Sequence, residues 1–403
     1  MDDFTDNRYD VHKLIYKRER RMLKIFVIGD NHFGKKYNRY PNIKDKLIES
    51  RFTAFEDMVK KAEKEGCELF VITGDLFDNI NSIKVSDVKR IASILSLFSN
   101  TVLILPGNHD YYSGEEKVWK DFLKAISSID SDYLVLNEFR KYELETSEET
   151  IEIYPAFCQS KHREENNLEW IKNGQIDEYG VINIGVAHGA LEGIAPDMDN
   201  KYFFMTREEL LSIPMDAWLI GHTHIPYPDN LKEEEDITGE KIFNPGTHEQ
   251  TDLGNRTEGN GFILTIKKEN GKATVSARKY VSGKIHFYDE PKIVLRPESD
   301  TVLVDTLRAR VGKRDKNAVI RLTITGSARQ TEYENRKQIY QEVLGDFLDY
   351  EIDDDELSEE ITVEKIRDEY AETSFAAQFM ECLIDQPMEL QMVYQLLDEC
   401  KDR

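Results

Sequence analysis

The chain has 403 residues, which exceeds a small module and suggests two domains, or one large domain with an appendage. Its formal net charge is -24 at pH 7, which at first sight argues against nucleic acid, because lysine and arginine drive phosphate binding. No run approaches the roughly 20 apolar residues of a membrane span, and the polar N-terminus lacks the apolar core of a signal peptide. We therefore expect a cytoplasmic protein without membrane association. The four cysteines are scattered, so no disulfide framework or thiolate zinc site is expected.

Short apolar runs that end in polar residues recur along the first part of the chain. They are LKIFVIGD (23–30), CELFVITGD (67–75), NTVLILPGNHD (100–110), VINIGVAHG (181–189) and DAWLIGHTH (216–224). Such runs are typical of buried strands that lead into loops. Helical patterns at 46–66, ending at Gly66, and at 85–99 alternate with the first runs. This alternation predicts an α/β fold.

The pattern changes after residue 240. Two alternating strands at 261–281, joined at Asn270-Gly271, predict a hairpin that closes the first domain near residue 285. Residues 289–300 are polar and contain two prolines, which indicates a linker. A helix, a strand and a helix are then expected at 300–311, 317–326 and 331–348.

Two amphipathic helices are expected after the acidic stretch 351–360. They cover 363–384 and 387–400, and the first places its apolar residues on one face: Ile366, Tyr370, Phe375, Phe379 and Leu383. We divide the chain into a polar and basic N-terminal extension (1–22), a main domain (23–285), a small domain with its linker (286–360) and C-terminal helices (361–403).

The residues that could bind a metal ion or take part in catalysis directly follow the apolar runs. In chain order they are Asp30 and His32, Asp75, Asn108 and His109, His188, and His222 and His224. Because the carboxyl ends of parallel strands meet at one edge of a sheet, we expect these distant segments to converge. Five of the nine histidines fall in these positions, which chance scattering does not favour.

Imidazole, carboxylate and amide ligands without a thiolate suit divalent ions such as Mn, Fe or Zn. Seven candidate ligands are too many for one tetrahedral ion, whereas one aspartate shared by two ions would give each about four protein ligands. Paired ions are usual for displacement at phosphorus, where a nearby histidine can protonate the leaving oxygen. We therefore predict a dinuclear metal site; a degenerate site is the alternative.

The order of the motifs D-x-H, GD, GNHD, H and G-H-x-H over residues 23–285 resembles the calcineurin-like metallophosphoesterases. GDLFD (74–78) together with GNHD (107–110) is most similar to the SbcD-type DNA repair exonucleases, the bacterial counterparts of the meiotic recombination 11 nuclease. The resemblance implies a four-layer β-sandwich flanked by helices, followed by a small α+β capping domain and C-terminal helices.

The resemblance also implies a role for each matching residue. Asp30, His32 and His224 would hold a first metal ion, Asn108, His188 and His222 a second, and Asp75 would bridge both, with Mn²⁺ as the expected metal. His109 would be the general acid or stabilise the transition state. Archaeal and eukaryotic relatives commonly carry a histidine after GDLF that assists exonuclease cleavage; Asp78 stands here, so that role is not transferred.

Three further residues are weaker candidates around the ligands or the substrate: Asp78, Asp110 and Asn244. Asp110 could orient a ligand histidine and Asn244 could border the phosphate, but a plain turn explains either equally well. His248 could approach the substrate, but a position on the surface is the favoured expectation. The basic cluster at 17–24 could contact a DNA backbone or form a solvated face.

The resemblance implies a metal-dependent DNA nuclease, the nuclease subunit of an SbcCD-like complex, which processes DNA ends by 3′-5′ exonuclease and endonuclease cleavage. It further implies an SbcC-like coiled-coil ATPase partner, docked on the C-terminal helices, and a homodimer. A phosphatase or phosphodiesterase acting on nucleotides or small phosphoesters is the first alternative. A non-catalytic scaffold is the second, and it is disfavoured because all seven ligands and His109 are present.

The negative charge is concentrated near the C-terminus. Residues 331–403 contain 22 Asp and Glu but only 6 Lys and Arg, so they carry -16 of the net charge of -24. The acidity therefore no longer excludes DNA, and it predicts a C-terminal region suited to a protein partner.

Overall fold

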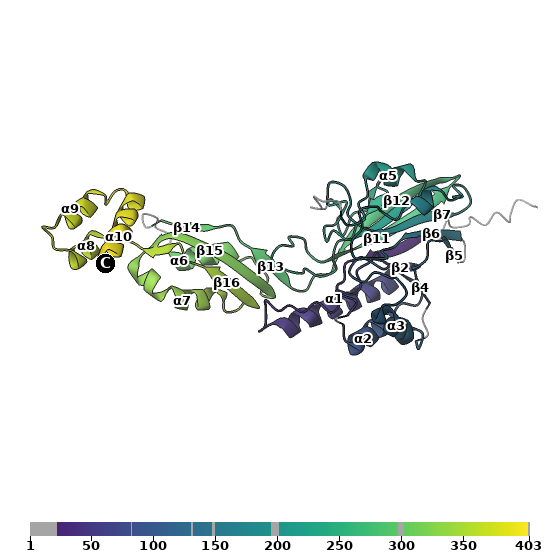
Figure 1. Ribbon diagram of the computed structural model, residues 1–403, viewed down its shortest axis with the longest axis horizontal. Helices are drawn as coiled ribbons and strands as arrows, with labels where there is room; N and C mark the ends of the chain where they lie inside the picture. Colours follow the sequence, from purple (N-terminus) through teal and green to yellow (C-terminus); the bar gives the residue numbers. More distant parts are fainter. Residues whose placement is uncertain are drawn as a thin grey trace, which may run out of the picture. The chain divides into compact units, whose positions relative to one another are not determined.

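The computed structural model describes residues 22–81, 83–129, 132–146, 150–194, 201–296 and 302–401 (Figure 1). The predicted N-terminal extension lies outside these ranges except for Met22, and so does most of the basic cluster at 17–24. The chain divides into an N-terminal unit, up to His286, and a C-terminal unit, from Phe287 onward.

The first sheet of the N-terminal unit has seven strands. In spatial order they are β4 (Tyr133–Val135), β3 (Thr101–Ile104), β2 (Leu69–Ile72), β1 (Leu23–Ile28), β11 (Asn260–Glu269), β12 (Lys272–Val281) and β9 (Ile237–Thr238). Strands β1 to β4 are mutually parallel, whereas β11, β12 and β9 run antiparallel to their neighbours. The predicted hairpin joins β11 to β12, and Asn270 and Gly271 have the positive φ angles (52° and 77°) that its tight turn requires.

The second sheet has five strands. In spatial order they are β10 (Ile242–Phe243), β8 (Ala217–Gly221), β7 (Ile182–His188), β6 (Thr150–Ala156) and β5 (Tyr142–Glu145). All are parallel except β5, which pairs antiparallel with β6. Both sheets therefore present a row of parallel carboxyl ends.

Helices cover the outer faces of both sheets. The first sheet packs against α1 (Lys44–Glu65), α2 (Val85–Leu95) and α3 (Lys117–Ile126) (Figure 1). The second sheet packs against α4 (Glu169–Lys172) and α5 (Arg207–Ser212). On β1, Phe26 and Ile28 pack with the helices, while Ile25 and Val27 pack toward the second sheet. Strands buried on both faces explain the continuous apolar runs. The four-layer α/β sandwich predicted from the resemblance is confirmed.

The C-terminal unit is built around one long strand, β15 (Ala318–Ala328). Its sheet also contains β13 (His286–Asp289), β14 (Ile293–Leu295), β16 (Asp349–Asp353) and β17 (Leu357–Glu359), and its helices are α6 (Leu303–Val311) and α7 (Gln330–Leu344). The predicted helix–strand–helix order is correct. The interpretation of 289–300 as a linker is wrong at Ile293–Leu295, because this short segment pairs with β15 and buries Ile293 and Leu295.

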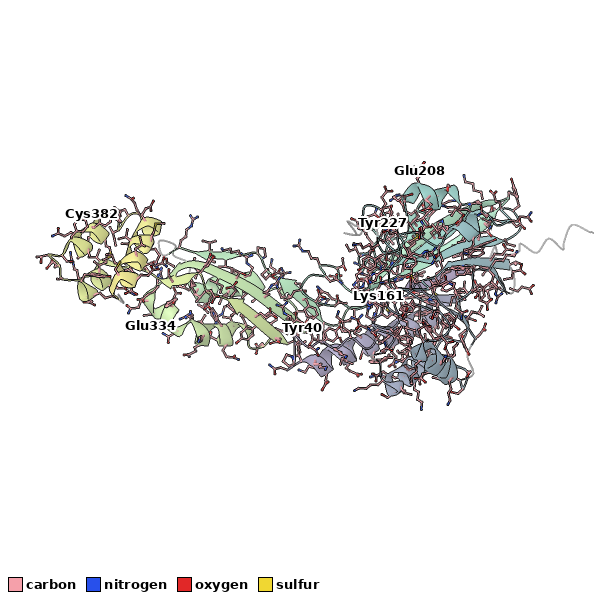
Figure 2. The ribbon with its side chains drawn as sticks, viewed as in Figure 1. Tyr40, Lys161, Glu208, Tyr227, Glu334 and Cys382 are labelled. Atoms are coloured by element: carbon pink, nitrogen blue, oxygen red, sulfur yellow. The ribbon has the colours of Figure 1, made fainter. Side chains whose placement is uncertain are left out.

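The C-terminal helices are α8 (Val363–Glu369), α9 (Phe375–Cys382) and α10 (Pro387–Lys401). The single helix predicted at 363–384 is interrupted, since Ser374 begins α9 by accepting the Ala377 N–H on its hydroxyl. The predicted common face is also split: Ile366 is buried, whereas Phe375 is 81% exposed. Cys382, labelled in Figure 2, is the last residue of α9.

Two further expectations concern the whole described chain. None of the helices in the described ranges is long and apolar enough to cross a membrane. The four cysteines are free, with Cys67 and Cys158 buried and Cys382 and Cys400 exposed.

Candidate metal centre

The loops that follow the parallel strands of both sheets bring the seven predicted ligands together. Asp30 and His32 follow β1, Asp75 follows β2, Asn108 follows β3, His188 ends β7, and His222 and His224 follow β8. Five of these side chains are buried, and His222 and His224 are partly buried. The two rows of carboxyl ends thus meet at one place, as expected for parallel strands.

Asp30, His32 and His224 form the first group of potential metal ligands. Their side-chain donor atoms lie within 4.8 Å of one another, and Nε2 of His32 is 2.8 Å from Nε2 of His224. The backbone N–H of His222 donates to both carboxylate oxygens of Asp30, at 2.9 and 3.1 Å. The Asp30 carboxylate is therefore held in place by the segment that carries His224.

Asn108, His188 and His222 form the second group. The side-chain carbonyl oxygen of Asn108 lies 3.0 Å from Nε2 of His188 and 3.0 Å from Nδ1 of His222. Nδ1 of His188 donates to the carbonyl oxygen of Thr73 at 2.9 Å. This hydrogen bond fixes the tautomer, so the His188 ring presents the lone pair of Nε2 to the site.

Asp75 stands between the two groups. Its Oδ2 lies 3.8 Å from Nε2 of His32 in the first group and 3.4 Å from Nε2 of His188 in the second. Its Oδ1 accepts the backbone N–H of His109 at 2.8 Å. One carboxylate therefore faces both groups.

Most of these ligands have an unusual backbone conformation. The φ angles are 49° for Asp30, 47° for His32, 51° for Asp75, 117° for His222 and 51° for His224. Positive φ is disfavoured for residues with a side chain and is concentrated at functional sites, where surrounding contacts hold it.

The glycines of the motifs leave room for this arrangement. A Cβ on Gly74 would lie 2.1 Å from Nδ1 of His188, and one on Gly107 would lie 2.2 Å from Oδ1 of Asp75. Glycine is required at both positions, because the backbone passes directly against a ligand side chain.

The electrostatics of the site suit bound cations. Burial raises the pKa of Asp30 to about 7; burial also acts on Asp75, but the His188 ring beside it holds the pKa of that carboxyl below its ordinary value. Burial holds the pKa of His224 well below its usual range, so its ring is neutral. Within the described ranges no lysine or arginine pairs with Asp30 or Asp75. Buried carboxylates together with imidazole nitrogens form a donor set that fits divalent metal ions.

His109 lies beside the first group, at the edge of the site. Its ring is 4.9 Å from that of His32, and its Nδ1 donates to the carbonyl oxygen of Asp78 at 2.9 Å. The Asp78 carboxylate lies 3.5 Å from Nδ1 of His32. The side chain of Asp78 therefore contacts His32, a predicted ligand. Its backbone carbonyl orients the ring of His109.

The other two candidates, Asp110 and Asn244, form hydrogen bonds with residues next to the ligands in the chain. The Asp110 carboxylate accepts the backbone N–H groups of Gly107 and Phe77, at 2.6 and 3.0 Å, so it fixes the GNHD turn and bonds no ligand histidine. The Asn244 amide donates to the Thr223 hydroxyl and accepts the N–H of Gly246. The prediction that His248 lies on the surface is wrong, because its ring is fully buried and bonds to the carbonyl oxygen of Arg51 at 3.0 Å.

Sequence reasoning missed Arg51 and a hollow beside the ligands. The hollow has a volume of about 660 Å³, and its lining includes His222, His224, Ile225, Tyr202 and Arg256. The Tyr202 ring lies 5.1 Å from the ring of His222. No motif contains Tyr202, so only the folded chain reveals its position.

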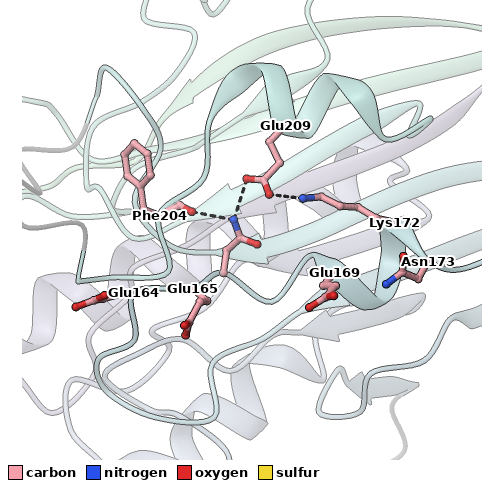
Figure 3. Close-up of a pocket in the computed structure, with 8 residues that line it drawn as sticks. Glu164, Glu165, Glu169, Lys172, Asn173, Phe204 and Glu209 are labelled. Atoms are coloured by element: carbon pink, nitrogen blue, oxygen red, sulfur yellow. Dashed lines mark hydrogen bonds and ion pairs between the residues drawn. The ribbon is translucent and has the colours of Figure 1, made fainter.

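A larger hollow, of about 810 Å³, contains none of the predicted ligands (Figure 3). Four glutamates line it, and one of them, Glu209, accepts hydrogen bonds from Asn166 and Lys172. Its acidic lining is unsuited to a phosphate.

The chain belongs to the calcineurin-like phosphoesterase family, whose model matches residues 23–226, half of the chain. The matched segment contains all seven predicted ligands and His109. Family membership together with this donor set makes the chain a metallophosphoesterase.

Individual relatives are distant. The uncharacterised metallophosphoesterase YhaO of Bacillus subtilis is 26% identical over 184 residues, which cover 44% of this chain and only 42% of YhaO. Two solved structures are similar to part of this chain. Calcineurin-like phosphoesterase YfkN from Bacillus subtilis has a TM-score of 0.38 at 15% identity, covering 65% of this chain and 90% of YfkN. A putative 5'-nucleotidase from Staphylococcus aureus has a TM-score of 0.37 at 12% identity, and the match covers 66% of this chain and 55% of the nucleotidase.

Proposed function

We propose that this metallophosphoesterase hydrolyses phosphodiester bonds of nucleotide substrates, DNA ends in particular, with two divalent metal ions, Mn²⁺ foremost. Asp30, His32 and His224 would hold the first ion, Asn108, His188 and His222 the second, and Asp75 both. The observation that carries the proposal is the position of Asp75, whose Oδ2 faces Nε2 of His32 and Nε2 of His188 at 3.8 and 3.4 Å.

Two bound metal ions neutralise charge on the phosphate oxygens and make a water nucleophilic at neutral pH. The protein residues position the reacting groups and handle the proton. Because Nδ1 of His109 donates to the Asp78 carbonyl oxygen, the proton that the ring can transfer is the one that Nε2 carries in the imidazolium form. We infer that His109 delivers this proton to the leaving oxygen. Its partly buried position at the edge of the donor set suits this role.

DNA is supported by the motifs GDLFD and GNHD and by the charge distribution, since residues 331–403 carry most of the net charge. A nucleotide or small phosphoester is the second candidate substrate. The hollow beside His222 and His224 supports it, because about 660 Å³ is the size of a small-molecule site. An aromatic ring, Tyr202, and an exposed cation, Arg256, would suit a nucleoside there.

The C-terminal helices support a protein partner. Four apolar side chains on α9 and α10 are exposed: Phe375 (81%), Phe379 (43%), Met392 (64%) and Leu396 (56%). An acidic unit with exposed apolar helix faces suits docking of a partner, for which we propose an SbcC-like coiled-coil ATPase. A homodimer remains an expectation from the resemblance.

A substrate panel tests the proposal. Purified protein with Mn²⁺ should hydrolyse bis-p-nitrophenyl phosphate faster than p-nitrophenyl phosphate, and it should release nucleotides from DNA with free ends. Asp75→Asn and chelated wild-type protein are the negative controls. Hydrolysis of mononucleotides without DNA cleavage would favour the second candidate. Absence of hydrolysis with every substrate and metal would favour a scaffold.

A further inference from the structure

Arg51 on α1 is a buried cation that belongs to none of the sequence motifs. Its side chain is only 2% exposed. No carboxylate in the described part of the chain lies within ion-pair distance of its guanidinium. Burying a charge without a counter-charge is unfavourable unless its hydrogen bonds are satisfied. The partners of Arg51 therefore indicate why the residue is there.

The guanidinium donates to oxygen atoms from three segments of the N-terminal unit. Nε and Nη2 both donate to the carbonyl oxygen of Asn31, at 2.9 and 2.5 Å. Nη1 donates to the Tyr37 hydroxyl at 3.1 Å and to the Glu249 carbonyl oxygen at 3.2 Å. A planar group with five N–H donors can reach all these acceptors at once, which an ammonium group cannot.

Asn31 is the residue between Asp30 and His32. Both neighbours have positive φ angles, 49° and 47°, and this conformation is unfavourable for a residue with a side chain. The buried side-chain amide of Asn31 makes no hydrogen bond, so the segment is held through its main chain. The Thr247 hydroxyl donates to the preceding carbonyl, that of Asp30, at 2.9 Å. Arg51 and Thr247 thus hold two consecutive carbonyl groups between the two ligands.

We propose that Arg51 is a positioning residue that sets the affinity of the first metal ion and leaves that of the second unchanged. It touches neither a ligand side chain nor the hollow beside the ligands; it acts by holding Asp30 and His32 in their left-handed conformation. The proposal rests on the proposed function, because that function assigns these two residues to the first ion. The second ion's ligands make no hydrogen bond with Arg51.

Titration of metal-free protein with Mn²⁺ alone tests this proposal. Calorimetry should resolve two Mn²⁺ sites in the wild type, and Arg51→Met should weaken one site by about tenfold or more, a usual effect of removing the support of a ligand. Low-temperature electron paramagnetic resonance should then show single Mn²⁺ ions where the wild type shows a coupled pair. Arg51→Lys, which can bond one carbonyl, should have a Mn²⁺ affinity at this site between those of the wild type and Arg51→Met. Arg90→Met, at an exposed ion pair with Glu49, is the matched control.

Thr247→Val covers the case in which Arg51→Met does not fold. The two side chains have the same shape, and the variant removes only the hydroxyl contacts, so we expect a several-fold loss of affinity at the same Mn²⁺ site. Equal weakening of both sites, or a lower melting temperature with unchanged Mn²⁺ titration, would overturn the inference. A wild type that binds fewer than two Mn²⁺ ions would contradict the proposed function itself.

Discussion

Nε2 of His32 and Nε2 of His224 lie 2.8 Å apart, although the two residues are 192 positions apart in the chain. Burial holds the pKa of both rings below their ordinary values, so both are neutral. Two neutral rings at this distance need either one shared proton or a cation between their lone pairs. A divalent ion shared with Asp30 would satisfy both rings and the buried carboxylate.

Replacing His109 with alanine should slow cleavage of a dinucleotide by about 10²–10⁴-fold in kcat, because the alkoxide leaving group then departs without a proton. The loss should be smaller for bis-p-nitrophenyl phosphate, since p-nitrophenolate is stable as an anion. Mn²⁺ affinity should change little, because the bond from His109 to Asp75 is made by the backbone N–H. Equal losses on both substrates would instead assign His109 to stabilising the transition state.

Gly107→Ala should remove most Mn²⁺ binding and activity. The new Cβ would lie 2.2 Å from Oδ1 and 2.3 Å from the backbone nitrogen of Asp75, so this bridging residue must move. Gly174→Ala is the control, because Gly174 is exposed and its added Cβ would have no neighbour closer than 3.3 Å. Calorimetry and kcat measurements on both variants check the prediction, which fails if Gly107→Ala binds Mn²⁺ like the wild type.

Tyr202→Ala should raise KM for a dinucleotide about tenfold, because the variant loses the stacking of one base on an aromatic ring. Its kcat on bis-p-nitrophenyl phosphate should be unchanged, because Tyr202 is no predicted ligand. Tyr179→Ala offers a comparison at a tyrosine that is 80% exposed and outside the hollow. Unchanged KM values in Tyr202→Ala would exclude the hollow as the nucleoside site.

Glu65→Gln should lower the free energy of unfolding by about 1 kcal/mol at pH 7. The hydrogen bonds from Lys61 and Arg278 lower the pKa of Glu65 to about 2 in the folded protein. The stabilisation is therefore fully present above the unfolded pKa of about 4.5 and is lost as the pH falls toward 2. Urea unfolding should show a smaller difference in the free energy of unfolding between variant and wild type at pH 3 than at pH 7. A constant difference would contradict the assignment; Glu56→Gln, at an exposed pair with Lys60, is the control.

The double variant Phe375→Ser, Phe379→Ser should abolish co-purification with a coiled-coil ATPase and leave hydrolysis of bis-p-nitrophenyl phosphate intact. The two rings stack on each other at 5.7 Å on the exposed side of α9, so their loss should hardly affect the melting temperature. Leu211→Ser, at an exposed leucine of α5, controls for general surface effects. Retained co-purification would rule out this helix face as the docking surface.

The order of strands and helices in the N-terminal unit could be predicted because each signal is local. Gly66 ends α1 with a φ of 66°, and Asn270-Gly271 turns the hairpin, as their residue types require. The C-terminal helices were less predictable. The apolar spacing at 363–384 fits one helix, but the Ser374 cap begins a new one, and a local hydrogen bond overrides the periodicity.

The sequence by itself determined which residues could bind metal, since polar groups at strand ends and glycines beside them are properties of short segments. Only the tertiary structure decided that Asp75 faces both groups, that His248 is buried, and that Arg51 holds the carbonyl between Asp30 and His32. These relationships join the ends of two sheets to a helix and to a distant loop. They depend on how the layers pack, and no local pattern of residues encodes that packing.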